Sequence, residues 1–471
     1  MTKNKAGKKV AKQAARKKTK SPASRRKVGT RAKRLPHDSV YRKTILPNGL
    51  TVVSESHGQF QSLSMGIWVK VGTRHERARE AGISHFLEHM LFKGTEKRTA
   101  LDIAREVDQV GGEFNAFTSR EYTCFHLLLL KRDMALGMDL LNDILLHSTF
   151  DAQEFEREKK VILQEISMVE ESPEEMVHDL YFELVYGKHG LGCPILGTER
   201  SVKRSKRGDL TRYFHKHYRP DQLVVAVAGD VSHQAVCKEL KELSKKQWHG
   251  RTLESHEPAA LAFEPAPQLK DGCWWIKRST EQVHLIWGVE AQKYNSKDRY
   301  AASLLNVYLG GGMSSELFQE IREKNALAYT VYSSLSPFVD SGVFTIYAAT
   351  AMHQVPLCIK LIEECVEKLK RDLLSDEDLR SVKENLKGTI LLSSDSVESR
   401  MSSIALNEIF MDDYTTAEEL CEEIDQVSAA EIRAVARRIF STGKRSILAL
   451  GPQPTKAVKE KLKPNFPKKY Q

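Results

Sequence analysis

The sequence has few cysteines and no long apolar run. Only seven of its 471 residues are cysteine, and no two of them form a CxxC pair. Because this set is odd and scattered, a disulfide scaffold is disfavoured and reduced thiols in a cytosol-like compartment are expected. The longest apolar runs, such as residues 125–130, are far too short to cross a bilayer. Apolar residues make up 41% of the chain, which excludes wholesale disorder and allows several domains.

Acidic residues are absent from positions 1–36, which contain fifteen lysines and arginines. Removing these from the total of 72 leaves 57 basic against 62 acidic residues, so the rest of the chain is mildly acidic. The segment lacks large apolar side chains, and we expect a disordered basic tail. Such a tail can contact nucleic acid or another acidic surface, or it can be merely solvated. It resembles neither a secretory signal nor an arginine-rich transit peptide, so a cytoplasmic location is expected, with the mitochondrial matrix as the alternative.

The rest of the chain alternates strand and helix signals. Residues 41–54 predict a hairpin, because the Asn48-Gly49 pair accepts the positive φ of a tight turn. Further signals predict strands at 62–71, around 113–130 and at 223–227. Helices are predicted at 81–93, 99–110, 151–170 and 233–246.

A weak internal repeat follows a stretch with three prolines. After it, strand signals at 283–288, 342–350 and 445–451 and a helical region at 354–395 repeat the earlier order at a period of roughly 220 residues. We therefore predict an α+β fold of two similar α/β-sandwich halves. The expected divisions are a tail at 1–36, an N-terminal domain at 37–249, a linker at 250–267 and a C-terminal domain at 268–471.

The most informative stretch is residues 82–92, which contain His85, Glu88 and His89. At about 100° per residue on a helix, Glu88 and His89 lie about 60° and 40° to either side of His85, so all three point one way. Two neutral imidazoles can bind Zn²⁺ and leave Glu88 beside the ion. Two histidines four residues apart are more often surface or core residues than ligands. The glutamate within this HxxEH pattern is what favours zinc.

A third protein ligand is predicted on the helix at 151–170. Its apolar stripe contains two carboxylates, Glu158 and Glu165, which would be costly to bury unpaired. A cation removes that cost, so we assign Glu165 to the metal and Glu158, two turns earlier, to the support of the ligands. A structural zinc site is normally closed by Cys or His, and no cysteine has ligand spacing relative to His85. An open position for water is therefore expected.

On these residues the sequence resembles the pitrilysin/insulinase family of zinc peptidases. The resemblance rests on residues 85–89 and on Glu165, 76 residues further on, and covers about residues 41–455. It is strongest for the processing-peptidase branch, whose chains have one active and one inactive half. Residues 111–119 are similar to the family's substrate-holding edge strand, and residues 309–315 and 322–329 to its C-terminal signature. The resemblance implies a clamshell half with one Zn²⁺ per chain on the inner wall of the first domain.

The resemblance also implies an activity, that of a zinc metalloendopeptidase acting on unfolded or short polypeptides. Glu88 would be the general base, and Glu158 would contribute to catalysis by supporting the metal ligands. Substrate would pair with an edge strand at Asn115, Ala116 and Phe117, although Asn115 also suits an ordinary turn or strand end.

Four further residues have roles only through the resemblance. Arg322 and Tyr329 would reach across the cavity to the substrate's carbonyl. The simpler alternative is that Arg322 is an ordinary surface residue and Tyr329 an ordinary core residue. Glu175 and Asp179 would accept a basic residue near the cleavage site. A solvated acidic face is an equal alternative for this second pair.

Two other functions and a partner remain open. A non-catalytic relative would serve as an assembly or structural subunit, but such relatives have lost parts of the HxxEH pattern, which is complete here. A nucleic-acid-bound factor would depend on the basic tail. Because two halves close only part of a chamber, a partner chain is expected, by default in a homodimer and otherwise as a related subunit.

Overall fold

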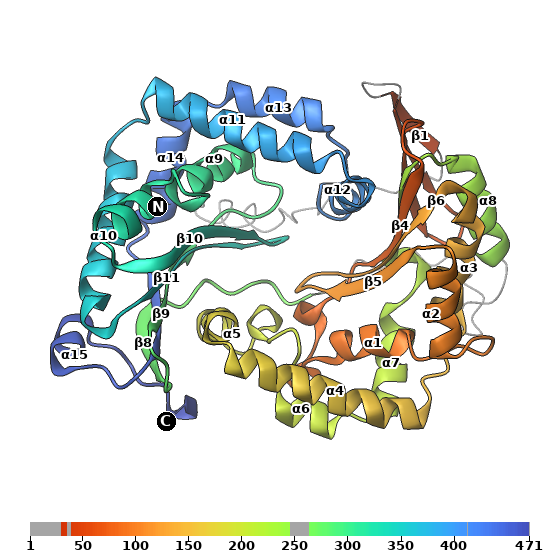
Figure 1. Cartoon of the computed structure of the whole chain (residues 1–471), viewed down its shortest axis with the longest axis horizontal. Helices are drawn as coiled ribbons and strands as arrows, with labels where there is room; N and C mark the ends of the chain where they lie inside the picture. Colours follow the sequence, from red (N-terminus) through yellow and green to blue (C-terminus); the bar gives the residue numbers. More distant parts are fainter. Residues whose placement is uncertain (1–29, 35–38, 245–262, 412, 471) are drawn as a thin grey trace, which may run out of the picture.

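A computed structural model describes residues 30–34, 39–244, 263–411 and 413–470 (Figure 1). The predicted disorder of residues 1–29 and most of the predicted linker lie outside these described residues. One expectation is corrected at the tail boundary, because residues 30–34 form the strand β1 (Thr30–Arg34). This strand forms by pairing its backbone antiparallel with β2 (Val40–Ile45).

The first half contains a seven-stranded sheet in the order β1-β2-β3-β7-β4-β6-β5. The predicted hairpin is confirmed: Gly49 has φ 89°, and Asn48 Oδ1 accepts a hydrogen bond from Leu50 N at 3.2 Å. The strand expected around 113–130 is two antiparallel strands joined by a turn. The remaining strands of this sheet are β3 (Thr51–Ser56), β4 (Ser62–Val69), β5 (Glu113–Thr118), β6 (Thr123–Leu130) and β7 (Leu223–Gly229).

One face of this sheet is covered by helices of the first half, with the larger apolar core between them. The helices predicted at 81–93, 99–110 and 151–170 are confirmed with slightly different ends, and the one predicted at 233–246 is confirmed as far as Ser244, the last described residue before the gap. The helices are α1 (Ile83–Leu91), α2 (Ala100–Gln109), α3 (Met134–Leu146), α4 (Ala152–Glu171), α5 (Pro173–Tyr186), α6 (Glu199–Arg204), α7 (Arg207–His217) and α8 (His233–Ser244). Short 3₁₀ turns are η2 (Thr73–His75), η3 (Ala78–Glu80), η4 (Lys131–Asp133), η5 (Gly190–Gly192) and η6 (Pro220–Gln222).

The second half repeats this plan with a five-stranded sheet in the order β10-β11-β9-β12-β8. Read by sequence position, this order matches β5-β6-β4-β7-β3 of the first sheet, so the predicted repeat is confirmed. The helical region expected at 354–395 is two helices, α10 and α11, because a short segment ends the first at Arg371. The strands are β8 (Gly272–Lys277), β9 (Val283–Glu290), β10 (Ala328–Pro337), β11 (Gly342–Thr350) and β12 (Ser446–Gly451).

The second half likewise contains a series of helices. They are α9 (Arg299–Gly310), the π-helix η7 (Phe318–Lys324), α10 (Val355–Arg371), α11 (Asp376–Ser393), α12 (Val397–Phe410), α13 (Ala417–Gln426), α14 (Ala429–Phe440) and α15 (Lys456–Leu462). Two 3₁₀ turns complete the half, η8 (Met352–Gln354) and η9 (Lys468–Tyr470). Among the described residues, no helix combines the length and apolar character that a membrane crossing requires.

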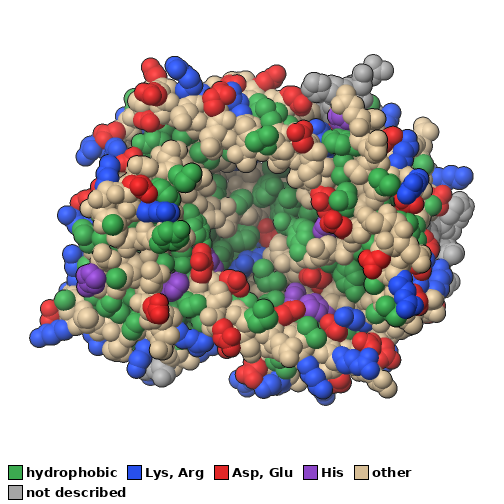
Figure 2. Space-filling view, in the orientation of Figure 1, with side chains coloured by type: hydrophobic (Ala, Val, Ile, Leu, Met, Phe, Trp, Pro, Cys, Tyr) green, Lys and Arg blue, Asp and Glu red, His purple; other side chains and the backbone are tan. Residues whose placement is uncertain are grey.

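In each half, one helix packs on the sheet of the other half. Helix α5 of the first half packs on the second sheet, where Val177 and Tyr181 share a buried cluster with Ile286. Helix α12 of the second half packs in return on the first sheet, where Trp68 Nε1 lies 3.1 Å from Met401 Sδ (Figure 1). Because both contacts are apolar and buried, they hold the two halves together. The space-filling view shows a hollow between the halves (Figure 2).

Candidate active site

Helix α1 is held in place by a buried carboxylate at its N-terminus. The Glu76 side chain accepts hydrogen bonds from Gly82 N at 2.7 Å and Ser84 N at 2.8 Å. These are two of the backbone donors that a helix start leaves without a partner. Gly82 has φ 88°, and a Cβ there would lie 2.5 Å from the carbonyl oxygen of Leu196, so only glycine fits. The start of α1 is therefore fixed by the Glu76 hydrogen bonds and by the close approach of Gly82 to Leu196.

Three predicted ligands meet between α1 and α4. His85, His89 and Glu165 each offer one atom, and these atoms lie within 4.8 Å of one another. Glu165 Oε2 lies 3.8 Å from His85 Nε2 and 3.5 Å from His89 Nε2. The two histidines are four residues apart on α1, and Glu165 faces them from the middle of α4. The predicted convergence of these three side chains is thus found in the structure.

The separation of these atoms fits a metal ion better than direct hydrogen bonds. Ligands about 2.1 Å from a tetrahedral zinc lie about 3.4 Å from each other, close to both observed distances. Glu165 Oε2, the atom that faces both histidines, is buried without a hydrogen-bond partner among the described residues, as expected when an ion completes the arrangement. Burial lowers the pKa of His85 to about 3, with a smaller contribution from His89. A neutral imidazole keeps its lone pair for a metal.

Glu158 supports the second histidine. Its Oε2 lies 2.9 Å from His89 Nδ1, and its Oε1 lies 2.9 Å from Lys93 Nζ. Burial works against the ionised carboxylate, but His89 and Lys93 outweigh it, and the pKa of Glu158 is lowered. An ionised Glu158 accepts the Nδ1 proton of His89 and leaves Nε2 facing Glu165. The position of Glu158 thus agrees with the supporting role predicted for it.

Glu88 lies between the two histidines and the edge of the first sheet. Its Oε2 accepts a hydrogen bond from Thr118 Oγ1 at 2.5 Å. Burial raises the pKa of Glu88, although the Thr118 hydroxyl and His89 oppose this change. A carboxylate with a raised pKa beside a metal site is suited to accept a proton and return it.

Strand β5 forms the free edge of the first sheet, next to Glu88. Asn115, Ala116 and Phe117 pair on one side with β6, and no other described strand pairs with the opposite side of their backbone. Asn115 Oδ1 accepts a hydrogen bond from Ala116 N at 2.8 Å, and the Phe117 side chain is 38% exposed. Such an edge can add an extended peptide as a further strand.

Arg322 and Tyr329 are not brought to the metal ligands. Both belong to the second half, where Arg322 Nη1 donates to the Tyr329 carbonyl at 3.2 Å and the guanidinium lies 4.4 Å from the Tyr329 ring centroid. Tyr329 is 74% exposed, so it is not the core tyrosine of the simpler alternative. Within one chain, the two residues contact each other rather than the first-half site.

Glu175 and Asp179 share α5 but differ in their surroundings. Asp179 Oδ1 lies 3.2 Å from Arg120 Nη2, an arginine of the same chain. Burial raises the pKa of Asp179, and Arg120 opposes this change. Glu175 is exposed. The chain's own arginine thus already occupies one side of the acidic pair.

Comparison with known proteins decides the family. Residues 51–199 match the family model for insulinase (peptidase family M16), and residues 205–386 match the model for the peptidase M16 inactive domain. An uncharacterized zinc protease of Bacillus subtilis (strain 168) is 38% identical over 394 residues, covering 84% of this chain and 94% of the relative. The chain belongs to peptidase family M16. The predicted pitrilysin/insulinase membership is thereby confirmed.

Other known proteins are similar to this chain in sequence or in fold. An uncharacterized zinc protease of Mycobacterium leprae is 37% identical, covering 88% of this chain and 92% of the relative. The crystal structure of a protease from Helicobacter pylori has a TM-score of 0.80 at 23% identity, covering 88% of this chain and 99% of that chain. A Pseudomonas fluorescens structure described as a peptidase M16 inactive domain has a TM-score of 0.80 at 20% identity, covering 88% and 98%.

Sequence reasoning missed three residues around this M16 site. Glu76 precedes α1 by seven positions, and nothing in its local pattern distinguishes it from a surface acid. Lys93 lies one turn after His89, and this helical spacing indicates that it shares the face of the metal ligands. Thr118 shares the inner face of β5 with Ala116 and Phe114. The alternation of strand side chains with a period of two indicates this from the sequence.

Proposed function

We propose that this M16 protein is a zinc-dependent endopeptidase that hydrolyses unfolded or short polypeptides. The observation that carries the proposal is the convergence of His85, His89 and Glu165 within 4.8 Å, beside Glu88 and an open sheet edge. A zinc ion held by these three residues would supply positive charge that lowers the pKa of water toward about 7 and polarises a peptide carbonyl. One ion per chain is expected, because the second half has no comparable group among the described residues.

The chain's own residues carry out the remaining steps of the proposed reaction. Glu88 takes a proton from the attacking water and delivers it to the leaving amine. Glu158 orients His89 through its Nδ1 proton. The backbone of Asn115, Ala116 and Phe117 aligns the extended substrate along β5. A finer proposal is that Glu175 and Asp179 give a preference for a basic residue near the cleavage site. Glu175 would contribute more, because Asp179 already pairs with Arg120.

The Glu88→Gln variant tests the proposal directly. Because the amide cannot take the proton, turnover in a peptide-library assay should fall by about 10³-fold or more while zinc content stays unchanged. Chelator should abolish activity in the wild type, and added zinc should restore it. A Glu88→Gln variant that remains fully active would remove Glu88 as the base. A wild type that binds zinc but cleaves no peptide would favour the non-catalytic assembly subunit.

We also propose that the active form contains two copies of this chain. Tyr329 is exposed and Arg322 is half-buried, and both lie apart from the ligands of their own chain, which suits a role at the site of a facing copy. Tyr329 would then donate to the substrate's carbonyl as negative charge develops. A processing-peptidase-like arrangement with a related partner subunit is the alternative.

Complementation between variants distinguishes these arrangements. Glu88→Gln and Tyr329→Phe would each be inactive alone, but in a two-copy site mixed dimers regain one complete site. The mixture should therefore recover up to roughly a quarter of wild-type activity, depending on the fraction of mixed dimers. No recovery in a sample shown to contain mixed dimers would mean that Glu88 and Tyr329 of the same chain serve one site, and a fully active Tyr329→Phe variant would give Tyr329 no role.

A further inference from the structure

The hydrogen bond between β5 and α1 gives Thr118 a specific task. Thr118 is the last residue of the edge strand, and its hydroxyl donates to Glu88 Oε2 at 2.5 Å. We propose that Thr118 is a positioning residue that aims the Glu88 carboxylate at the attacking water and ties it to the substrate-binding strand. This inference rests on the proposed peptidase function.

The geometry assigns different tasks to the two carboxylate oxygens. A hydroxyl at 2.5 Å from an oxygen is at the short end of the range for a hydrogen bond to an ionised carboxylate. With Oε2 occupied, Oε1 is left to accept the proton of the attacking water. Glu88 has three side-chain torsions, and nothing else described in the structure donates to its carboxylate. The Thr118 hydroxyl therefore selects one orientation among several.

Thr118 can position Glu88 because the turn that follows it is fixed. Ser119 N donates to the Tyr122 carbonyl at 2.8 Å, and Arg74 N donates to the Arg120 carbonyl at 2.8 Å. Thr118 itself pairs with Thr123 across the β5–β6 ladder. The strand end that carries the Thr118 hydroxyl is therefore held in place by the backbone hydrogen bonds of this turn.

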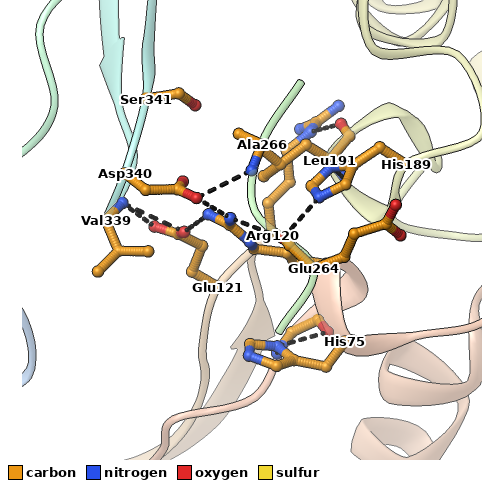
Figure 3. A network of polar contacts seen from close by, with 12 residues as sticks. His75, Arg120, Glu121, His189, Leu191, Glu264, Ala266, Val339, Asp340 and Ser341 are labelled. Carbon is orange, nitrogen blue, oxygen red and sulfur yellow. Dashed lines mark hydrogen bonds and ion pairs between the residues drawn. The ribbon is translucent and has the colours of Figure 1, made fainter. Parts of the chain in front are cut away.

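The same turn is anchored to the second half of the chain. Glu121 accepts hydrogen bonds from Val339 N at 3.1 and 3.2 Å, and its Oε1 lies 2.6 Å from Arg74 Nη1 (Figure 3). Arg120 donates from Nε to the Leu191 carbonyl at 3.1 Å. Because Arg74 and Glu121 are both buried, these contacts are shielded from water. The half that has no metal ligands therefore helps to hold the base through Glu121 and Thr118.

A purely structural role for Thr118 makes different predictions. If the hydroxyl only ends the strand or satisfies a buried oxygen, its loss would change stability and leave the rate per folded molecule unchanged. If it positions Glu88, its loss would lower kcat with little change in KM, because substrate still binds along β5. The ligands His85, His89 and Glu165 do not contact Thr118 in the described hydrogen bonds, so zinc content should not change.

The experiment compares Thr118→Val with Thr118→Ser in the zinc-loaded, full-length protein. Valine keeps the shape and β propensity of threonine and removes the hydroxyl, whereas serine retains it. Thr118→Val should lower kcat by about 10- to 100-fold at unchanged KM and zinc content. Thr118→Ser should stay within about 3-fold of wild type. Thr211→Val is the matched control, because among the described residues its hydroxyl donates to the Arg207 carbonyl of its own helix and has no other partner.

A second measurement does not depend on turnover. In crystals of the metal-free Thr118→Val variant, the Glu88 carboxylate should leave its wild-type position or occupy several, while the histidines stay in place. An unmoved Glu88 together with unchanged kcat would overturn the proposal, as would equal losses in the valine and serine variants. A wild type without peptidase activity would refute the proposed function alone, and the Glu88 conformation would still decide whether Thr118 holds that side chain.

Discussion

The two halves have the same strand order but place different side chains on the helix that follows their second shared strand. In the first half this helix is α1, which contains His85, Glu88 and His89. Its counterpart α9 contains no histidine, aspartate, glutamate or cysteine. The fold alone therefore does not make a metal site, since function depends on the residues placed on it.

The paired helices α4 and α11 show the same contrast. Glu158 on α4 is buried and Glu165 is half-buried, and both face α1. On α11, Glu384 is exposed and pairs with Lys387 of its own helix. Burying a carboxylate is costly without a compensating charge. Helix α4 therefore buries Glu158 beside His89 and Lys93, which offset this cost, whereas the acids of α11 are exposed to water.

The largest expected effect is loss of the metal from the first half. Glu165→Ala should reduce zinc from about one ion per chain to well below that, because two histidines alone hold zinc weakly. Peptidase activity should fall by about 10³-fold or more. Metal analysis by mass spectrometry after dialysis checks the first result, and a peptide assay the second.

The matched control for this change is Glu384→Ala in the second half. Its carboxylate is 67% exposed and lies 2.8 Å from Lys387, so zinc content and activity should stay at the wild-type level. Zinc lost equally from both variants would contradict the contrast between the halves. Unchanged zinc in Glu165→Ala would remove that residue from the ligands.

A large effect on stability is expected where the halves meet. Arg74 pairs with Glu121 of the first half and with Asp340 of the second, at 2.6 Å each, and its side chain is fully buried. Arg74→Met leaves two carboxylates facing each other without their cation. The free energy of unfolding should fall by about 3–5 kcal/mol.

Denaturant unfolding measures this change, and Arg212→Met is its control. Arg212 pairs with Asp209 on the surface of α7, and its side chain is 71% exposed. Removing it should cost at most about 1 kcal/mol. Similar losses in both variants would show that the buried cluster contributes no more than a surface pair.

Much of this structure could be predicted from local signals. The HxxEH pattern and the acids within the apolar stripe of α4 placed His85, His89 and Glu165 together, because helical spacing fixes which side chains share a face. The Asn48-Gly49 turn and the repeat were read in the same way. The ligands and the turn depend on residues close in sequence or on helical spacing, and the weak repeat depends on the order of the strand and helix signals.

Contacts between distant segments were not predictable in this way. The exchange of α5 and α12 between the sheets joins residues such as Val177 and Ile286, and no local pattern specifies such a pair. Glu76 and Thr118 act on α1 through bonds that need the folded chain. The strand β1 was missed because its basic sequence resembles a solvated tail, while its pairing is through the backbone.

The smallest expected effect concerns the pH dependence of the two helix starts. Burial raises the pKa of Glu76, at the start of α1, to about 7, and Glu80 adds to this while the Gly82 and Ser84 amides oppose it. At α9, burial of Asp298 is outweighed by Arg438 and Ser296, and the pKa of Asp298 is lowered. The two starts should therefore respond to pH with opposite signs.

For Glu76 the folded pKa is above the unfolded value, so its contribution is fully present below pH 4.5 and is lost as pH rises through about 7. Relative to Glu76→Gln, the free energy of unfolding of the wild type should fall by up to about 3 kcal/mol over that range. For Asp298 the contribution is present above pH 3.8 and is lost as pH falls through the lowered folded pKa, so Asp298→Asn should differ from wild type most at neutral pH. Urea unfolding of the metal-free proteins at several pH values measures both. If the Glu76→Gln difference were constant from pH 4.5 to 7, the carboxylate would keep one charge state throughout, and the amide donors at the start of α1 would outweigh its burial.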